Sequence, residues 1–387
     1  MTRLDDCFNI DDLRLAARRR LPKGIFEFVD KGTEDELALA NNRAAFQAIR
    51  LRNRVCMDVT GTVVDSTLFG KPMGFPLAIS PTGLAGLCWF EGELALARAA
   101  AAAGIPVTLA TGSVTAMERL AKEAPGRLWF QLYMWRDRAL SHGLVRRAQD
   151  AGFEALVLTA DTGLGGNREH NKRNGFGMPF RLSRRNVPDL IRHPGWLARV
   201  LLPYILKSGI PRHENYPEGH RKSIMKREEG KHARGENMTW KDVEELRKIW
   251  KGPFLVKGIL RPDDARSAVE CGADGIIVSN HGGRAMDAAA APIDVLPEIV
   301  EAVGNRTTVI VDSGARRGSD IVKALALGAK AVMMGKSGLY GVAVGGEAGA
   351  ARALSLLKNE MRQTMGYVGC RSVEEIGRDV LWVPKAS

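Results

Sequence analysis

The sequence predicts a (β/α)8 barrel, because short apolar runs alternate regularly with segments of helical periodicity. Eight apolar runs occur, at residues 76–80, 107–111, 128–133, 155–161, 254–258, 275–281, 308–314 and 331–336. Several of the intervening segments end in Ala-Gly or Cys-Gly just before the next run, as helices often do. Eight such units over about 260 residues are typical of a closed barrel. A doubly wound open sheet is the alternative, disfavoured because no GxGxxG follows the first run.

The parts of the chain outside the eight units are assigned from their sequence patterns and lengths. We expect residues 1–75 to form a helical cap and lead-in, because amphipathic patterns cover 9–21 and 25–46. The barrel is expected over 76–366, with a tail at 367–387. About 90 residues separate the fourth and fifth runs, far more than a loop and helix need. An insertion therefore interrupts the barrel there, and its basic part spans 178–237.

Composition narrows the class of protein. Of the 387 residues, 45% are hydrophobic and 26% charged, as in ordinary globular proteins. There is no signal-peptide pattern and no run of 18 apolar residues, and the five cysteines lack disulfide or metal spacing. These features predict a cytoplasmic protein without a metal site.

The net charge of +12 is concentrated in one segment. Residues 181–234 contain 13 Lys and Arg against five Asp and Glu. No zinc-finger spacing or RNA-binding aromatic motif accompanies them, so we expect no nucleic-acid partner. A non-catalytic basic protein that binds nucleic acid or membrane remains the alternative to an enzyme.

Polar residues follow the apolar runs, where barrels place their active sites. Read in order they are Pro81, Thr82, Gly83, Thr111, Gln131, Tyr133, Thr159, Asp161, Lys257, Ser279, His281, Asp312 and Gly335. His281 and Arg284, separated by two glycines, can converge on one small anion. Asp161 can orient His281 and stabilise its charged form. The alternative for a lone histidine is a satisfied core residue.

The other cationic side chains near the strand ends also predict anionic ligands. Arg168 and Arg284 can clamp a carboxylate, and Lys257 can face an anionic group or form a strand-end salt bridge. The last two strand ends continue into glycine-bearing loops that carry Gly314, Arg316 and Lys336. Barrels commonly bind phosphate there, which predicts a phosphorylated cofactor. The alternative is that the loop arginines only cover the barrel rim.

The motifs Phe130–Tyr133, Val256–Gly258, Ser279–Arg284 and Asp312–Asp320 occur together, and the likeness begins at Leu21–Glu36. In this combination the chain resembles the FMN-dependent 2-hydroxy acid dehydrogenase and oxidase family. The segments Pro81–Gly86 and Thr159–Arg168 are most similar to its mandelate and lactate dehydrogenases.

The resemblance implies FMN-dependent oxidation of an (S)-2-hydroxy acid to the 2-oxo acid. His281 is then the base, Asp161 its orienting carboxylate and Lys257 the partner of flavin N1. Arg168, Arg284 and Tyr133 bind the substrate. Electrons pass to flavin N5 as a hydride or by way of a carbanion. The implied FMN contacts are Pro81, Thr82, Gly83, Thr111, Gln131, Thr159, Lys257, Ser279, Asp312, Gly314, Arg316, Gly335 and Lys336.

The chain departs from the family at four places: Phe26 replaces a carboxylate-binding Tyr, Ala110 a Ser, Lys336 an Arg, and Arg284–Asp287 reads Arg-Ala-Met-Asp. The missing hydroxyl should weaken carboxylate binding by roughly 1–3 kcal/mol, or it marks a changed substrate. Gly83 and Gly112 leave room for a bulky or aromatic side group, unless they serve tight turns.

In membrane-associated members of the family the insertion docks on the bilayer and quinone reoxidises the flavin. The basic segment with Trp196, Leu201, Leu202, Tyr204 and Ile205 fits an anionic membrane surface on the cytoplasmic side. A solvated loop is the alternative. The resemblance also implies a homotetramer. Rival activities are an oxidase that forms hydrogen peroxide and a flavin tailoring enzyme with a larger substrate.

Overall fold

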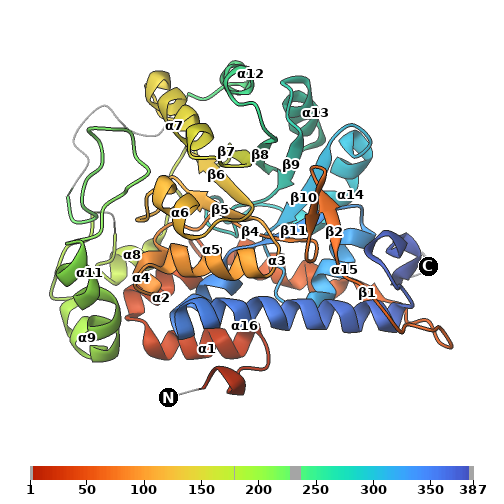
Figure 1. Ribbon diagram of the computed structural model, residues 1–387, viewed down its shortest axis with the longest axis horizontal. Helices are drawn as coiled ribbons and strands as arrows, with labels where there is room; N and C mark the ends of the chain where they lie inside the picture. The colour runs from red at the N-terminus through yellow and green to blue at the C-terminus, as the bar shows by residue number, and fades with distance from the viewer. Residues whose placement is uncertain (1–2, 178, 227–236, 383–387) are drawn as a thin grey trace.

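The computed structural model describes residues 3–177, 179–226 and 237–382. Parallel strands β4 to β11 follow one another around a closed barrel, and β11 pairs with β4 (Figure 1). Each predicted run corresponds to one strand, which confirms the barrel. The strands are β4 (Leu77–Ile79), β5 (Val107–Ala110), β6 (Leu128–Leu132), β7 (Ala155–Thr159), β8 (Phe254–Ile259), β9 (Gly275–Val278), β10 (Thr308–Asp312) and β11 (Ala331–Met334).

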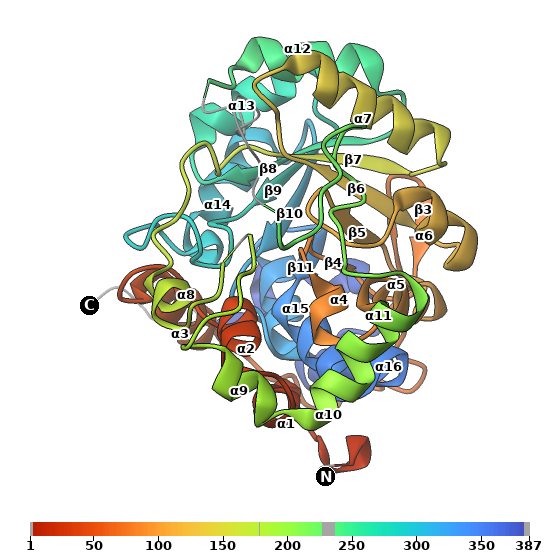
Figure 2. The same cartoon turned by 90° about the vertical axis from the view of Figure 1, so that its left-hand side faces the viewer.

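Helices cover the outside of the barrel (Figure 2). In chain order they are α4 (Ala85–Cys88), α5 (Gly92–Ala102), α6 (Met117–Glu123), α7 (Arg138–Asp150), α12 (Trp240–Ile249), α13 (Pro262–Glu270), α14 (Pro292–Val303), α15 (Gly318–Ala326) and α16 (Lys336–Val368). A kink at Gly345 and Gly346 divides α16.

The hairpin of β2 (Ser66–Leu68) and β3 (Lys71–Met73) closes the amino end of the barrel. Leu68 and Met73 join the buried cluster inside the barrel, and the Phe69 ring lies 6.1 Å from that of Trp129. The interior is therefore filled with side chains, and the carboxyl end is left for a binding site.

The helical cap consists of α1 (Ile10–Arg20), α2 (Lys23–Asp30) and α3 (Leu37–Ala48). The Asn9 side chain accepts a hydrogen bond from the Asp12 N–H at 2.9 Å and so caps α1, which packs along α16. Asp287, in the loop after β9, accepts the Ala38 N–H at 3.1 Å. The cap is thereby fixed over the carboxyl rim. Farther on, β1 (Arg50–Leu51) pairs with β12 (Leu381–Trp382).

The insertion after β7 contains α8 (Glu169–Arg173), α9 (Val187–Ile191), α10 (Pro194–Trp196), the π-helical turn η2 (Leu197–Leu201) and α11 (Leu202–Lys207). Of the predicted basic segment 178–237, residues 178 and 227–236 lie outside the described residues. Figure 2 shows α9 and α10, in green, beside α1.

One sequence prediction about this insertion is wrong. Trp196 and Tyr204 are buried, not part of an exposed surface. The Trp196 indole donates to the Leu87 carbonyl at 2.7 Å, and the Tyr204 hydroxyl accepts the Glu91 N–H at 3.2 Å. Trp196, Val200 and Tyr204 follow one another at a spacing of four, and residues four apart share a helix face, so all three face inward. The exposed apolar residues of this run are Leu202, Ile205 and Leu206.

Candidate active site

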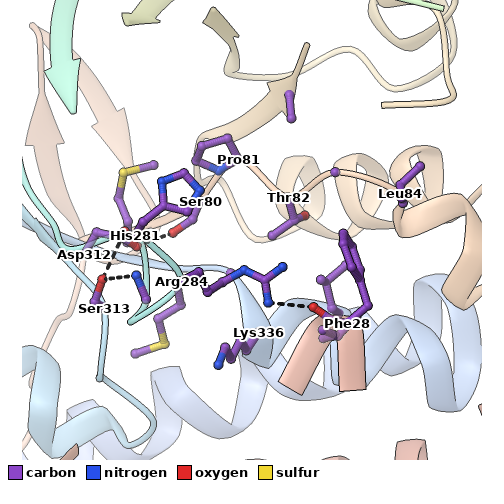
Figure 3. Close-up of a pocket in the computed structure, with 18 of the residues that line it drawn as sticks. Phe28, Ser80, Pro81, Thr82, Leu84, His281, Arg284, Asp312, Ser313 and Lys336 are labelled. Carbon is purple, nitrogen blue, oxygen red and sulfur yellow. Dashed lines mark hydrogen bonds between the residues drawn. The ribbon is translucent and has the colours of Figure 1, made fainter. Parts of the chain in front are cut away.

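A cavity of about 410 Å³ lies at the carboxyl end of the barrel, beneath the cap and the insertion (Figure 3). Most of the predicted site residues line it: Pro81, Thr82, Gly83, Tyr133, Arg168, Lys257, His281, Arg284, Asp312, Gly314, Arg316, Gly335 and Lys336. Residues at or after the ends of seven barrel strands thus meet in one space, as the barrel geometry predicts.

His281 and Asp161 form a hydrogen-bonded pair. His281 Nδ1 lies 2.9 Å from Asp161 Oδ1, and the Tyr133 hydroxyl lies 3.5 Å from His281 Nε2. Burial lowers the pKa of His281, while the Asp161 carboxylate acts in the opposite direction. Because Asp161 accepts from Nδ1–H, Nε2 carries the lone pair on the neutral ring. His281 can therefore accept a proton at Nε2.

The backbone around this pair is unusual. His281 has a φ of +61°, a left-handed conformation that is unfavourable for a residue with a side chain. Its N–H donates to Ser279 Oγ at 3.0 Å, which helps to hold that conformation. Gly258 has a φ of +104°, and a Cβ there would lie 2.5 Å from the Cβ of Asp161. Glycine at 258 thus makes room for the carboxylate that orients His281.

Lys257 belongs to a buried network at the strand ends. Its ammonium lies 2.7 Å from Asp312 and donates to Ser279 Oγ at 2.7 Å, and Ser80 Oγ donates to Asp312 at 2.6 Å. Burial lowers the pKa of Lys257, but the Asp312 and Asp161 carboxylates outweigh burial and leave the pKa raised. Burial likewise opposes ionisation of Asp312, yet Lys257 holds the Asp312 pKa below its usual value. Both groups are charged at neutral pH.

Arg284 and Arg168 place two guanidinium groups in the cavity wall. Arg284 Nη1 donates to the carbonyls of Phe28 at 2.6 Å and Lys31 at 3.0 Å (Figure 3). Arg168 donates to the Arg284 carbonyl at 3.4 Å. Burial, and then the neighbouring Arg168 charge, lower the pKa of Arg284 to about 9. An anion between the two arginines would relieve this electrostatic cost.

The prediction that Phe26 faces the substrate needs correction. Phe26 does not line the cavity, whereas Phe28 does, and the Arg284 guanidinium lies 5.1 Å from the Phe28 ring centre. Phe26 instead lies near Arg14, at 6.0 Å. Two positions along a helix differ by about 200° in direction, so only one of the two rings can face inward. The ring that lacks the carboxylate-binding hydroxyl in the pocket is therefore Phe28, not Phe26.

Further cations line the cavity. Lys336 Nζ donates to the Asp30 carbonyl at 2.6 Å. Burial, and then the Arg284 charge, lower the pKa of Lys336 to about 7. Arg316 also lines the cavity, and so does Arg43 from α3, which bonds to Asp320. Local sequence patterns could not single out Arg43, because it lies in the cap, far from the strand ends in sequence.

Four predicted cofactor contacts do not line the cavity: Thr111, Gln131, Thr159 and Ser279. Thr111 Oγ1 donates to the Gln131 carbonyl at 2.6 Å, and Gln131 Oε1 accepts the Thr111 N–H at 3.3 Å. Gln131 Nε2 is buried without a hydrogen-bond partner. Thr159 pairs in register with Lys257.

These features fit FMN. The buried Gln131 amide can donate to a heteroaromatic ring that carries acceptors. The cations Arg316 and Lys336 suit a phosphate, and a Cβ at Gly335 would lie 3.0 Å from Thr82, so the backbone there is closely packed.

The insertion contributes two residues that local sequence patterns did not single out, His213 and Tyr216. Both line the cavity, and their rings stack with centres 4.6 Å apart. His213 Nδ1 lies 3.1 Å from the Gly112 carbonyl. A Cβ at Gly112 would meet nothing within 4 Å, and one at Gly83 only the Gly112 oxygen at 3.8 Å. Tight packing therefore does not require these glycines.

Fold and site together define a barrel oxidoreductase that uses a phosphorylated flavin. The family model described as FMN-dependent dehydrogenase matches residues 17–383, and the chain belongs to this family. The (S)-mandelate dehydrogenase of Pseudomonas putida is 40% identical over 375 residues, which cover 97% of this chain and 93% of the relative. An L-lactate dehydrogenase of Stenotrophomonas maltophilia (strain R551-3) is 41% identical over 377 residues, 96% of this chain and 97% of the relative.

A solved structure agrees with this assignment. The crystal structure of the monotopic membrane protein (S)-mandelate dehydrogenase matches with a TM-score of 0.90 and 39% identity, over 97% of this chain and 99% of that one. The protein is therefore an FMN-dependent oxidoreductase that acts on a CH–OH group, as the sequence predicted. In the described part of the chain, no helix is long and apolar enough to cross a membrane.

Proposed function

We propose that this protein oxidises an (S)-2-hydroxy acid with an aromatic or otherwise bulky side group to the 2-oxo acid, with His281 as the base. The observation that carries the proposal is that His281, paired with Asp161 at 2.9 Å, lines one cavity with Arg168 and Arg284. The arginines bind the substrate carboxylate and so orient the hydroxyl-bearing carbon. FMN, when bound, supplies the acceptor for two electrons.

His281 accepts the substrate proton at Nε2, and the Asp161 carboxylate stabilises the resulting imidazolium. Tyr133 lies on the Nε2 side of the ring and donates a hydrogen bond to the substrate oxygen. Lys257 stays charged in its buried network and favours negative charge on the reduced cofactor. Gln131 and Thr111 would hold the ring region of FMN, and Arg316 and Lys336 would hold its phosphate.

The proposed preference for a bulky side group rests on open space in the same cavity. Gly83 and Gly112 leave space open there, and the stacked His213 and Tyr216 rings offer an aromatic surface. Aromatic side groups pack favourably against such rings.

We also propose a quinone-type electron acceptor, reached from a peripheral position on the cytoplasmic face of the membrane. Leu202, Ile205 and Leu206 are exposed on α11, within the segment that carries the surplus of positive charge. An apolar stripe among basic residues suits the interface of an anionic bilayer.

The test of the chemistry is anaerobic bleaching of the flavin by (S)-2-hydroxy acids, from lactate to mandelate and longer chains. Mandelate-like acids should bleach fastest. Failure of every simple 2-hydroxy acid would overturn the proposal in favour of a larger substrate. During aerobic turnover a quinone analogue should be reduced with little peroxide. If one peroxide forms for each substrate oxidised, the electron acceptor is oxygen and the proposed quinone acceptor is wrong.

The test of the membrane position is fractionation with native membranes at low salt. Replacing Leu202, Ile205 and Leu206 together by Ser should release the protein, whereas Val55→Ser, an exposed apolar residue outside the insertion, should not. If the wild-type protein stays wholly in the supernatant, the proposed membrane position is wrong.

A further inference from the structure

The carboxyl end of α2 holds two of the cations that line the active-site cavity. The last carbonyls of a helix have no partner within the helix, and the negative end of its dipole attracts cations. Arg284 Nη1 donates to the carbonyls of Phe28 and Lys31, at 2.6 and 3.0 Å. Lys336 Nζ donates to the Asp30 carbonyl at 2.6 Å. One helix end thus holds a guanidinium and an ammonium from opposite parts of the chain.

The side chain of Asp30 fixes this helix end. Arg14 of α1 donates to both Asp30 carboxylate oxygens, at 2.5 and 2.7 Å, and the Tyr340 hydroxyl of α16 donates to Asp30 Oδ1 at 2.6 Å. Burial opposes ionisation of Asp30, but Arg14 and Tyr340 hold the Asp30 pKa below its usual value. The carboxylate is therefore charged at neutral pH and ties α2 to two neighbouring helices.

Asp30 and α16 meet at two points. Lys336 and Tyr340 are four residues apart on α16 and so share a helix face. Lys336 contacts the carbonyl of Asp30, and Tyr340 contacts its carboxylate. A shift of α2 along α16 would break both bonds and would also move the Phe28 carbonyl that holds Arg284. The place of one cation is therefore linked to that of the other through Asp30.

We propose that Asp30 is a positioning residue that couples substrate binding to cofactor binding, because it places Arg284 and Lys336 together. The inference rests on the proposed function, in which Arg284 binds the substrate carboxylate and Lys336 the FMN phosphate. Asp30 does not line the cavity and acts through these two cations.

Asp30 also affects the charge of Lys336. Burial lowers the pKa of Lys336, and the Arg284 and Arg316 charges lower it further. The carboxylates of Asp30 and Glu36 act in the opposite direction. Loss of the Asp30 charge should therefore deprotonate Lys336 at a lower pH, which a purely mechanical role for Asp30 would not do.

Asp30→Asn tests the proposal, because it removes the charge and nearly keeps the shape. The dissociation constant of FMN is measured by flavin fluorescence at several pH values. Those of pyruvate and phenylglyoxylate, two 2-oxo acids, are measured at saturating FMN from changes in the flavin spectrum. FMN and the 2-oxo acid that wild type binds more tightly should each bind the variant about tenfold more weakly. The midpoint of the pH dependence of FMN affinity should also fall.

Asp242→Asn is the matched control. Arg138 donates to both Asp242 oxygens, at 2.6 and 3.0 Å, but this pair joins α7 to α12 and does not line the cavity. The control should leave both affinities unchanged. Tyr340→Phe keeps the Asp30 charge and removes one bond, so it should weaken both affinities by a smaller factor and leave the pH midpoint in place. If Asp30→Asn does not fold, Tyr340→Phe decides whether both affinities depend on this contact.

The coupling and the proposed function can fail separately. Weaker binding of only one ligand, an unchanged pH midpoint in Asp30→Asn, or equal losses in Asp242→Asn would overturn the coupling. If wild type is bleached by 2-hydroxy acids and Asp30→Asn changes neither affinity, only the coupling is wrong. If wild type binds FMN but no 2-oxo acid, the proposed substrate site is wrong, and the coupling is wrong with it.

Discussion

At the scale of single residues, His281 has two opposing influences on its pKa. Burial lowers the pKa from the ordinary 6.5, and Asp161 raises it. The rate should therefore rise with pH as His281 loses its proton, with a midpoint below that of an exposed histidine. Asp161→Asn should lower kcat by about 10²–10⁴-fold and move this midpoint to lower pH. The pH profile of kcat/KM measures both effects. His281→Asn, which removes the titrating group, is the control. If Asp161→Asn leaves the midpoint of the pH profile unchanged, Asp161 does not raise the pKa of His281.

Lys336 predicts a linkage between FMN binding and protonation. In the FMN-free protein its pKa is about 7, against an ordinary 10.5, so between these values the folded chain binds fewer protons there than the unfolded chain. The free energy of unfolding of FMN-free protein should accordingly gain a contribution that rises with pH over this window. A phosphate favours the charged ammonium, so FMN binding above pH 7 takes up a proton and FMN affinity falls as pH rises.

Lys336→Arg tests this linkage, because an arginine stays charged throughout the window. The variant should lose the pH dependence of the FMN dissociation constant, measured by flavin fluorescence, whereas the exposed Lys330→Arg should keep it. Identical pH profiles for wild type and Lys336→Arg would remove Lys336 from the phosphate site.

Phe28 and Phe26 offer a paired experiment on the substrate carboxylate. Phe28 lies in the cavity wall and Phe26 does not. Phe28→Tyr should lower KM for a 2-hydroxy acid by about tenfold, because a hydrogen bond to a charged group contributes roughly 1.5–3 kcal/mol. Phe26→Tyr should leave KM unchanged. Steady-state kinetics measure both variants, and the opposite result would restore Phe26 as the pocket residue.

At the scale of elements, the insertion has two parts that pack at different places. Residues 192–200 line a second cavity together with Arg19 and Arg20 of α1, whereas the later segment brings His213 and Tyr216 to the active site. The Tyr216 ring also lies 5.2 Å from that of Trp135, in the loop after β6. The segment is thereby held against the barrel rather than left as a solvated loop.

Tyr216→Ala should therefore raise KM for aryl 2-hydroxy acids by several-fold, because aromatic pairs contribute about 0.5–1.5 kcal/mol beyond burial. The KM for lactate, which lacks the ring, serves as the internal control and should change less. Equal changes for both substrates would indicate a general disturbance of the segment rather than a contact with the side group.

At the scale of the whole molecule, the active site is complete only when the cap lies on the barrel. Asn42 and Asn280 exchange hydrogen bonds of 2.9 and 2.6 Å between α3 and the loop after β9. Gly314 permits this approach: its φ is +92°, and a Cβ there would lie 2.4 Å from the Asn42 carbonyl oxygen.

Gly314→Ala should push the cap from the rim, lower stability by more than the roughly 1 kcal/mol of a positive-φ alanine and weaken FMN retention. Gly152→Ala is the matched control, because Gly152 has a φ of +79° but nothing within 4 Å of a Cβ. Thermal unfolding and flavin content measure the two effects. Equal behaviour of both variants would mean that backbone strain alone, and not the cap contact, matters at Gly314.

The sequence by itself determined the barrel and most of the strand-end residues, including His281, Asp161, Lys257 and Asp312. Strand and helix periods are local properties, and a barrel brings all carboxyl strand ends to one rim, so spacing alone sufficed. Only the tertiary structure decided the contacts between segments distant in the chain. It selected Phe28 over Phe26, turned Trp196 and Tyr204 inward, and brought His213 and Tyr216 to the cavity. These outcomes depend on how a helix is rotated or a long insertion packs, which local patterns specify only weakly.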